Sequence, residues 1–370
     1  MVLAFLLGCS NSTSTAAATI PQTTGPSVGD AARVLVVMNE SDNDSIRIAG
    51  YYLKKRGISR DQLVGIKTST TDNISPDRYK SEIETPIRAA LAKNPKIDFI
   101  VLTKGIPLRL VDEGGYSVDA TLASMELNFA PIGQTPGKFG ITEANAEDAI
   151  KRCRNPYFAA KEPFSHKRYG MYLVTRLIGY SVEDCLKLVD NSVAAKPSKA
   201  PILLDSQPKF QPGSGYWPLE ESMLHANEVL SVKNIAVDYD KTETFSDDGG
   251  TPLAGYASWG SNDKNYDPVA YHNLKFVPGA IAETFVSTSA RTFTPTKGGQ
   301  SLIADLVQQG VTGVKGYVSE PFTFALCRTE ILFDRYESGF NLAESFYAAS
   351  PIVKWKDIVV GDPLCRPYKK

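Results

Sequence analysis

Short apolar runs alternate with amphipathic stretches along most of this chain. Residues 34–38 are apolar throughout, which is typical of a strand buried on both faces. Residues 46–56 have the spacing of an amphipathic helix and end at Gly57. The same alternation predicts further strands at 62–67, 97–103, 169–177, 201–205, 235–239, 280–286 and 314–318, one more running into Trp259, and helices at 76–93, 181–195, 218–232 and 300–309.

This order of elements predicts an α/β fold with mostly parallel sheets. Strands linked by helices form right-handed crossovers that place helices on both faces of a sheet. A length of 370 residues allows two lobes. Because residues 111–165 are irregular and rich in Gly, Pro and Asn, we expect a first lobe over 31–165, which includes this excursion, and a second lobe over 166–370.

Charge and hydrophobicity argue against two classes of partner, nucleic acid and the interior of a membrane. Lys and Arg number 40 against 41 Asp and Glu, so the net charge of -1 gives no field that would attract nucleic acid. No apolar run reaches the roughly 20 residues of a membrane-spanning helix. We therefore expect a soluble body that binds no nucleic acid.

The first 30 residues suggest a lipid anchor. Residues 1–8 are apolar. The segment Leu6-Leu-Gly-Cys9, which ends one residue after this run, resembles the lipobox of bacterial lipoproteins. Cleavage before Cys9 and lipidation of its sulfur would tether an exported protein to the membrane. Residues 9–30 would then be a flexible tether, rich in Ser, Thr and Ala. The alternative is an apolar tail without this role, since no Lys or Arg precedes the run.

Four further cysteines suit an oxidising compartment. Cys153, Cys185, Cys327 and Cys365 are an even set compatible with two disulfides in three connectivities, of which Cys153–Cys185 and Cys327–Cys365 are the pairs nearest in sequence. No CxxC or His-containing spacing of a zinc site occurs.

The candidate site lies where two neighbouring strands end. Small and hydroxylated residues follow these strands, at 255–263 and 285–293, and strand ends in an α/β sheet face the ligand crevice. The first segment offers Ser258, Trp259, Ser261 and Asn262 as ligand-binding residues. The alternative is that Trp259 is a core or crevice-wall aromatic and that the polar residues cap the next helix.

A second set of residues has catalytic potential. Three adjacent hydroxyl groups follow the later strand, and a lysine and carboxylates follow other strands, so these groups would converge at one sheet edge. The catalytic candidates are Ser287, Thr288, Ser289, Lys104 and Asp263, and the further ligand-binding candidates are Asp205 and Glu320. Lys104 is equally well a surface lysine, and Glu320, before Pro321, a turn residue.

Sequence motifs for several common cofactors and reactions are absent from the chain. No GxGxxG or GxxxxGK[ST] follows a strand, and no GxSxG elbow is present, so no nucleotide or other cofactor is expected. The acidic run 40–44 lacks the glycine and terminal glutamate of an EF-hand, and a helix start is the better interpretation.

Three segments resemble gingipain-type cysteine peptidases, which have a caspase-like fold of two consecutive α/β lobes. The segments are 172–181, 255–263 followed by 285–293, and 359–364 with its Gly-Asp-Pro. In that family, the strand that corresponds to 255–263 ends in the catalytic His, and the strand that corresponds to 285–293 ends in the catalytic Cys. Here Trp259 and Thr288 stand at those positions, so the resemblance implies the scaffold without the Cys/His dyad.

The chain from Arg33 onward also resembles an uncharacterised family of exported bacterial proteins of about 350 residues. The shared residues are Asn39, Ser45, Lys104-Gly-Ile-Pro107, Asp119, Ser258 to Asp263, Ser319-Glu-Pro321 and Gly361-Asp-Pro363. Asp362 is interpreted as structural, since Asp-Pro builds a turn.

Two functions follow from these observations. The first is a lipid-anchored binding or structural protein of the cell envelope, without peptidase activity, that takes a peptide or glycan ligand. The second is a hydrolase with a Ser or Thr nucleophile in segment 287–289. The first is preferred, because neither strand end carries a Cys or His.

Overall fold

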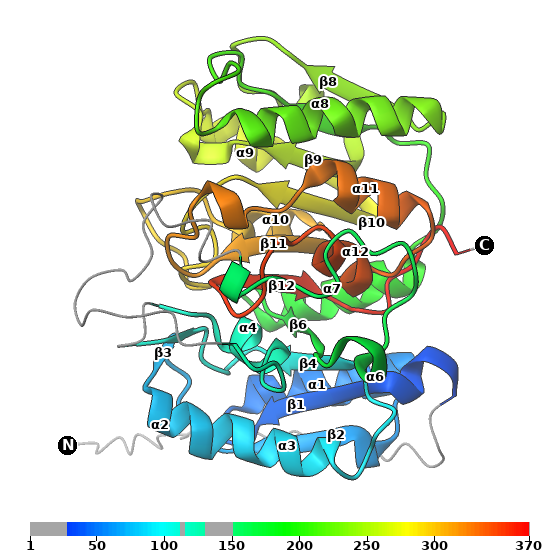
Figure 1. Cartoon of the computed structure of the whole chain (residues 1–370), viewed down its shortest axis with the longest axis vertical. Helices are drawn as coiled ribbons and strands as arrows, with labels where there is room; N and C mark the ends of the chain where they lie inside the picture. Colours follow the sequence, from blue (N-terminus) through cyan, green and yellow to red (C-terminus); the bar gives the residue numbers. More distant parts are fainter. Residues whose placement is uncertain (1–27, 112–114, 130–150, 370) are drawn as a thin grey trace, which may run out of the picture.

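The fold is built around one ten-stranded sheet (Figure 1). A computed structural model describes residues 28–111, 115–129 and 151–369. From one edge to the other the strands are β2 (Leu63–Ile66), β1 (Val34–Asn39), β4 (Phe99–Thr103), β6 (Leu173–Leu177), β12 (Asp357–Gly361), β11 (Gly313–Tyr317), β10 (Lys275–Thr284), β9 (Pro252–Ser258), β7 (Ile202–Asp205) and β8 (Val237–Asp240). A separate two-stranded sheet pairs β3 (Asn73–Ile74) with β5 (Arg109–Leu110).

Strand β12 joins the two halves of the sheet. It is antiparallel to β11 over five residue pairs and meets β6 at Val360 and Arg176. On either side of this junction all neighbouring strands are parallel. The mostly parallel α/β fold predicted from the sequence is therefore confirmed. Strand β6, which belongs to the predicted second lobe, pairs with β4 of the first, so strands of both lobes form one sheet.

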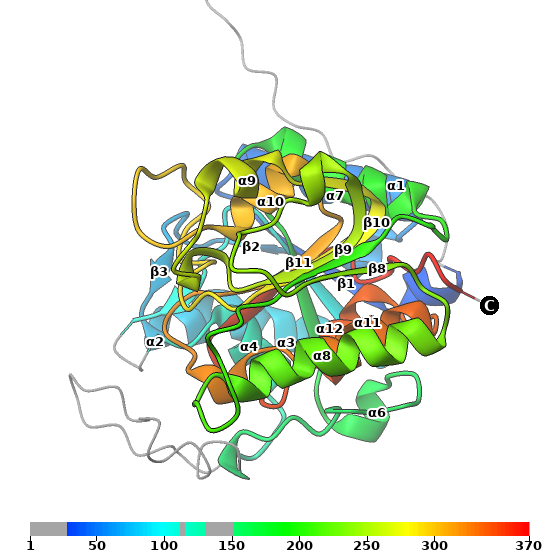
Figure 2. The same cartoon turned by 90° about the horizontal axis from the view of Figure 1, so that it is seen from above.

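Helices cover both faces of the sheet (Figure 2). One face carries α1 (Asn43–Arg56), α7 (Val182–Ala194), α9 (Pro268–Asn273) and α10 (Ile303–Gln309), and the other carries α3 (Thr85–Leu91), α4 (Val118–Ala123), α8 (Trp217–Val232), α11 (Thr329–Glu337) and α12 (Leu342–Ala348). Two short helices are α2 (Pro76–Arg78) and α6 (His166–Tyr169). Central strands are consequently buried on both faces, as their apolar sequences require. No helix within the described ranges is long and apolar enough to cross a membrane.

Most element predictions hold, and the departures have local causes. The helix predicted at 76–93 passes through a π-helical segment, Tyr79–Glu84, just before Pro86, whose missing N–H interrupts the regular hydrogen-bond ladder. Strand β10 begins at Lys275, five residues earlier than predicted, because its pairing with β9 shifts around Gly279 (φ +94°) and resumes at Ile281. Of the predicted irregular excursion, 112–114 and 130–150 lie outside the described residues, and α4 lies between them.

Helix starts and the C-terminal turn follow the sequence signals. The acidic run 40–44 begins α1, where the side chain of Asp42 accepts a hydrogen bond from the Asp44 N–H. Asp362 after β12 is fully buried, accepts hydrogen bonds from Tyr52 and Ser192, and forms an ion pair with Arg56. Its structural role is thus to fasten the chain end to α1 and α7.

The four cysteines of the described chain are free, buried thiols. Neither pair considered from the sequence is a disulfide, because the partners contact different elements. Cys153 packs beside Val353, whereas the Cys185 thiol donates to the Ser181 carbonyl within α7. Likewise the Cys327 N–H bonds Tyr317, and the Cys365 thiol bonds Tyr336. Burial raises the pKa of the Cys153 thiol to about 11.

Candidate functional site

Four neighbouring parallel strands end side by side and carry the loops of the candidate site. The strands are β7, β9, β10 and β11, and each ends in a loop at the same edge of the sheet. Ligands of open α/β sheets bind outside the carboxyl ends of the strands. This edge contains both segments singled out in the sequence, 255–263 and 285–293.

The four loops enclose a pocket of about 490 Å³, which we call the aromatic pocket. Its walls come from the loops after β7, β9, β10 and β11. The lining residues are Lys209, Phe210, Tyr216, Trp259, Asn262, Phe285, Ser287, Glu320, Pro321, Phe322, Thr323 and Leu326. Five of these side chains are aromatic, and such side chains supply most of the apolar contact area in ligand pockets.

Trp259 contacts three other aromatic residues of the pocket wall. Its side chain is only 1 % exposed, and its ring centroid lies 4.3 Å from that of Phe210, 5.1 Å from Phe285 and 5.7 Å from Tyr216. The indole N–H donates to the carboxyl group of Glu220 in α8. Trp259 is thus a pocket-wall aromatic whose polar edge is already occupied.

Buried carboxyl groups hold the loops beneath the pocket. Glu220 also accepts hydrogen bonds from the Ser206 hydroxyl and the Gln207 N–H, both at 2.7 Å. The Gln207 amide in turn donates to Asp263 Oδ1 at 2.5 Å. Burial raises the pKa of Glu220, while its three hydrogen bonds oppose that rise. The predicted catalytic candidate Asp263 is therefore part of a buried scaffold and does not line the pocket.

Asp205 and Ser258 form a second buried contact at the strand ends. The Ser258 hydroxyl donates to Asp205 Oδ2 at 2.9 Å and accepts from the Gly260 N–H at 2.9 Å. Burial raises the pKa of Asp205 to about 8, so this group keeps its proton at neutral pH. Both residues were predicted ligand contacts, but both are buried below the pocket wall.

The three predicted hydroxyl nucleophiles have different surroundings. Ser289 is fully buried, and its Oγ accepts from the Tyr317 N–H at 3.3 Å. The Thr288 hydroxyl donates to Gln300 Oε1 at 2.7 Å. Ser287 alone lines the pocket, and its hydroxyl has no hydrogen-bond partner in the described chain. Only Ser287 is placed to meet a ligand.

Lys104 is far from these hydroxyls. It follows β4, whereas 287–289 follow β10, and three strands lie between them. Four strand spacings amount to roughly 19 Å, well beyond the reach of a lysine side chain. The Lys104 ammonium instead donates to the Gly179 carbonyl at 2.9 Å. The structure therefore does not bring the predicted base and nucleophiles together.

Ser261 and Asn262 tie the first loop to the second instead of capping the next helix. The Ser261 hydroxyl oxygen accepts from the Ser301 N–H at 2.9 Å. The Asn262 amide donates to the Phe285 carbonyl at 2.6 Å and accepts from Gln300 at 2.8 Å. Helix α9 is capped by Asp267. The expectation of a helix cap was thus wrong, since these groups fasten two pocket loops to each other.

Glu320 stands at the pocket wall beside a strained residue. Its carboxylate accepts from the Phe322 N–H at 2.9 Å, and its backbone carbonyl accepts from Lys356 at 2.8 Å. Phe322 has φ +61° and ψ 160°, a conformation that non-glycine residues rarely adopt and that concentrates at functional sites. Burial lowers the pKa of the Lys356 ammonium to about 8. Glu320 is thus both a turn residue and a pocket residue.

Sequence reasoning missed most of the aromatic wall. Phe210 and Tyr216 lie in the loop after β7, and Phe322 follows β11. The available signal was an aromatic residue shortly after each of several predicted strands, but only Trp259 was singled out.

Groups for acid–base or metal chemistry are sparse around the pocket. Of the histidines, His166 bonds the Met171 carbonyl, His272 bonds the Pro268 carbonyl, and His225 lies within α8. None of them lines the pocket. Throughout 28–111, 115–129 and 151–369, no group of three or more His, Cys, Asp or Glu side chains is arranged to hold a metal ion.

The fold has a counterpart among solved structures. Comparison with protein-family models and with curated proteins gave no match. The chain is similar to a solved structure described as "Structure of Protease", with a TM-score of 0.51 and 10 % identity over 94 % of this chain and 80 % of that chain. At this identity the similarity concerns the fold alone, which is a mostly parallel α/β sheet with helices.

Proposed function

We propose that this chain is a non-peptidase binding protein whose aromatic pocket takes an apolar side chain of a peptide. The observation that carries the proposal is the pocket itself, which lies at the carboxyl ends of four neighbouring strands and is walled by five aromatic residues. Ligand sites of α/β proteins lie in this position, and apolar pockets with few polar groups favour apolar ligand groups.

The shape of the pocket favours an inserted side chain over a stacked sugar ring. A sugar platform requires an exposed aromatic face, whereas Trp259, which contacts the rings around it, is only 1 % exposed. Rings of Phe210, Tyr216 and Phe285 surround it at centroid distances of 4.3 to 5.7 Å. A phenyl or branched aliphatic group would bury its surface against these rings.

Polar groups at the wall suit the peptide backbone beside such a side chain. Ser287 offers a hydroxyl without a partner among the described residues, and Glu320 offers a carboxylate. Lys209 stands over the Phe210 ring at 4.7 Å and adds a cation. These groups would accept hydrogen bonds from peptide N–H groups and donate hydrogen bonds to peptide C=O groups on either side of the apolar side chain.

Calorimetric titration with acetylated tripeptide amides tests the proposal. The peptides differ only in the central residue, which is Phe, Leu, Ala or Asp. We expect the Phe and Leu peptides to bind at least about tenfold more tightly than the Ala and Asp peptides. Tyr216→Ala should weaken binding of the Phe peptide about tenfold, whereas Val232→Ala, an exposed apolar residue at the end of α8, should not change it. Equal affinity for all four peptides would contradict the proposal.

A hydrolase using Ser287 is the alternative, favoured by its unpartnered hydroxyl in the pocket. A serine nucleophile needs a base within hydrogen-bond reach, and no hydrogen bond joins Ser287 to one in the described chain. We therefore expect a fluorophosphonate probe to leave the protein unlabelled. Labelling that disappears in Ser287→Ala would establish the alternative.

We further propose that the protein is exported and anchored to a membrane through a lipid on Cys9. The support is the lipobox-like segment ending at Cys9, which lies outside the described residues. Cys9→Ser should move the protein from the membrane fraction to the soluble fraction. Retention of the variant in the membrane fraction would exclude this anchor.

A further inference from the structure

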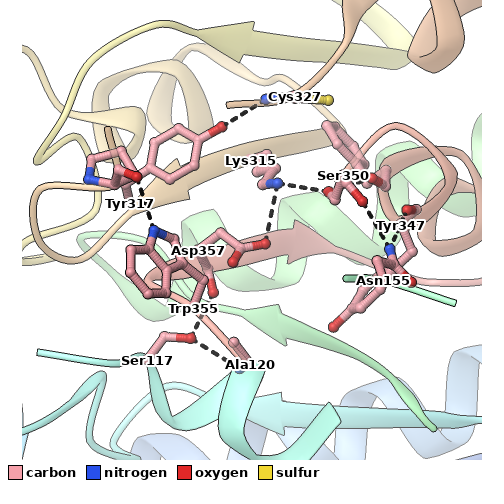
Figure 3. A network of polar contacts seen from close by, with 12 residues as sticks. Ser117, Ala120, Asn155, Lys315, Tyr317, Cys327, Tyr347, Ser350, Trp355 and Asp357 are labelled. Atoms are coloured by element: carbon pink, nitrogen blue, oxygen red, sulfur yellow. Dashed lines mark hydrogen bonds and ion pairs between the residues drawn. The ribbon is translucent and has the colours of Figure 1, made fainter. Parts of the chain in front are cut away.

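Lys315 is a fully buried lysine at the centre of the sheet. It lies in β11, and its side chain is 0 % exposed. Its ammonium group lies 3.1 Å from Asp357 Oδ2 at the start of β12 and donates to the Ser350 hydroxyl at 2.6 Å (Figure 3). Strands β11 and β12 are adjacent and antiparallel, so the sheet itself holds the amine against the carboxyl group.

A second carboxyl group stands on the other side of the lysine. Glu283 in β10 is the direct register partner of Lys315, so the two side chains extend from the same face of the sheet. Glu283 is fully buried, and its Oε1 accepts from the Tyr317 hydroxyl at 2.6 Å. Its Oε2 is buried without a hydrogen-bond partner in the described chain. Burial raises the pKa of Glu283 to about 8, so this carboxyl group carries a proton at neutral pH.

We propose that Lys315 and Asp357 join in an intramolecular amide bond. A proton first passes from the Lys315 ammonium to the Asp357 carboxylate, which leaves a neutral amine and a neutral acid. The amine lone pair then attacks Asp357 Cγ, so the Nζ–Cγ bond forms and one Cγ–Oδ bond breaks. The second amine proton passes directly to the departing oxygen, with which the amine is already in contact. Water is the only other product, and no oxidant or cofactor is required.

The buried position makes this reaction favourable. Two ions removed from water lose their solvation, and converting them into an amide removes both charges at once. Holding amine and carboxyl group in contact also replaces a bimolecular encounter by an intramolecular one. The Asp357 side chain is 13 % exposed, which gives the released water a way out.

An exposed pair within the same chain provides the contrast. Lys55 and Asp190 lie closer together, at 2.6 Å, but their side chains are 39 % and 46 % exposed. Water solvates both ions there, and the neighbouring Tyr51 hydroxyl donates to Asp190. Proximity alone would link this pair as well, whereas the proposed mechanism links only Lys315 and Asp357.

Tryptic mass mapping of the folded full-length chain tests the proposal. Trypsin cleaves after Lys and Arg, but it does not cleave after a lysine whose amine is an amide. The linked protein should therefore yield residues 298–328, uncut at Lys315, joined to residues 357–369 and lighter than the sum of both by one water. Peptides containing Lys55 and Asp190 should be recovered unlinked.

A variant without the amine separates the link from incomplete digestion. Lys315→Met should yield peptide 298–328, still uncut at position 315, and peptide 357–369 as separate masses, while circular dichroism remains that of the wild type. Recovery of free peptides 298–315 and 357–369 alone from the folded wild-type protein would overturn the proposal. The mass map does not depend on the aromatic pocket or on its ligand, so this experiment tests the amide bond independently of the proposed binding function.

Discussion

Asp205, Glu220 and Glu283 are carboxyl side chains that the fold removes from water. Burial is the largest cause of a raised pKa in each of them, and it brings the pKa of Asp205 and of Glu283 to about 8. Each is positioned by specific donors, such as Ser258 for Asp205. Groups of this kind make the stability of the protein depend on pH.

Asp205→Asn should flatten the pH dependence of stability between about pH 4 and pH 8. In this range folded Asp205 holds a proton that the unfolded chain releases, so wild-type stability falls as the pH rises, by at most about 1.4 kcal/mol per pH unit from this group. The amide carries no titrating proton, and its oxygen can still accept from Ser258. Urea unfolding at pH 5 and pH 8 measures the difference.

The control for this experiment is Glu221→Gln, which changes an exposed carboxylate on α8. This variant should retain the wild-type slope. If Asp205→Asn retained that slope too, Asp205 would be ionised in the folded protein at neutral pH.

The sequence indicated a pocket residue only where that residue directly follows a predicted strand. Trp259 and Ser287 follow predicted strands, and both line the pocket. Ser258 and Asp205 also end strands, but their side chains point into the protein, because successive residues of a strand alternate between faces. Phe210 and Tyr216 also follow a predicted strand, but the path of their loop depends on tertiary contacts, so their position after the strand did not show that they face the pocket.

Strands and helices with continuous patterns were predictable as elements. Strand β1 and helix α7 match their predicted ranges within one or two residues, because apolar runs and a capping Ser181 mark them locally. Helices α11 and α12 were not predicted. Helix α12 is buried along its whole length, so it lacks the polar face of an amphipathic helix, although Asn341 and Glu344 form a capping box at its start.

The contact between α4 and β6 should depend on one buried ion pair. Arg176 in β6 is fully buried, binds Asp119 in α4, and donates to the carbonyls of Ile106 and Pro107. Asp119→Ala would leave the guanidinium buried without its counter-charge, and we expect a loss of about 3–5 kcal/mol in the free energy of unfolding. Urea denaturation followed by circular dichroism provides the measurement.

An exposed ion pair serves as the comparison for Asp119→Ala. Arg78 and Glu82 pair one turn apart on a solvent-facing helix, and Arg78→Ala should cost no more than about 0.5 kcal/mol. Equal losses in both variants would contradict the structural role assigned to the Arg176–Asp119 pair.

At the scale of the whole molecule, the sheet accounts for the position of the site. Ten strands form one surface, and β7, β9, β10 and β11 end together at the aromatic pocket. The sheet class was predictable from alternating elements, but the strand order was not, since β12 enters the centre of the sheet from the end of the chain. That insertion also adds a strand between Lys104 and the hydroxyls of 287–289, which the sequence predicted to meet at one sheet edge.

The most direct test of binding without cleavage is hydrogen-exchange mass spectrometry with the Phe tripeptide. We predict slower exchange in the four pocket loops, at 206–216, 259–263, 285–288 and 318–326, together with an unchanged peptide mass after prolonged incubation. Protection confined to another part of the chain would show that the pocket is not the binding site. Cleavage of the peptide would show that the protein is a hydrolase.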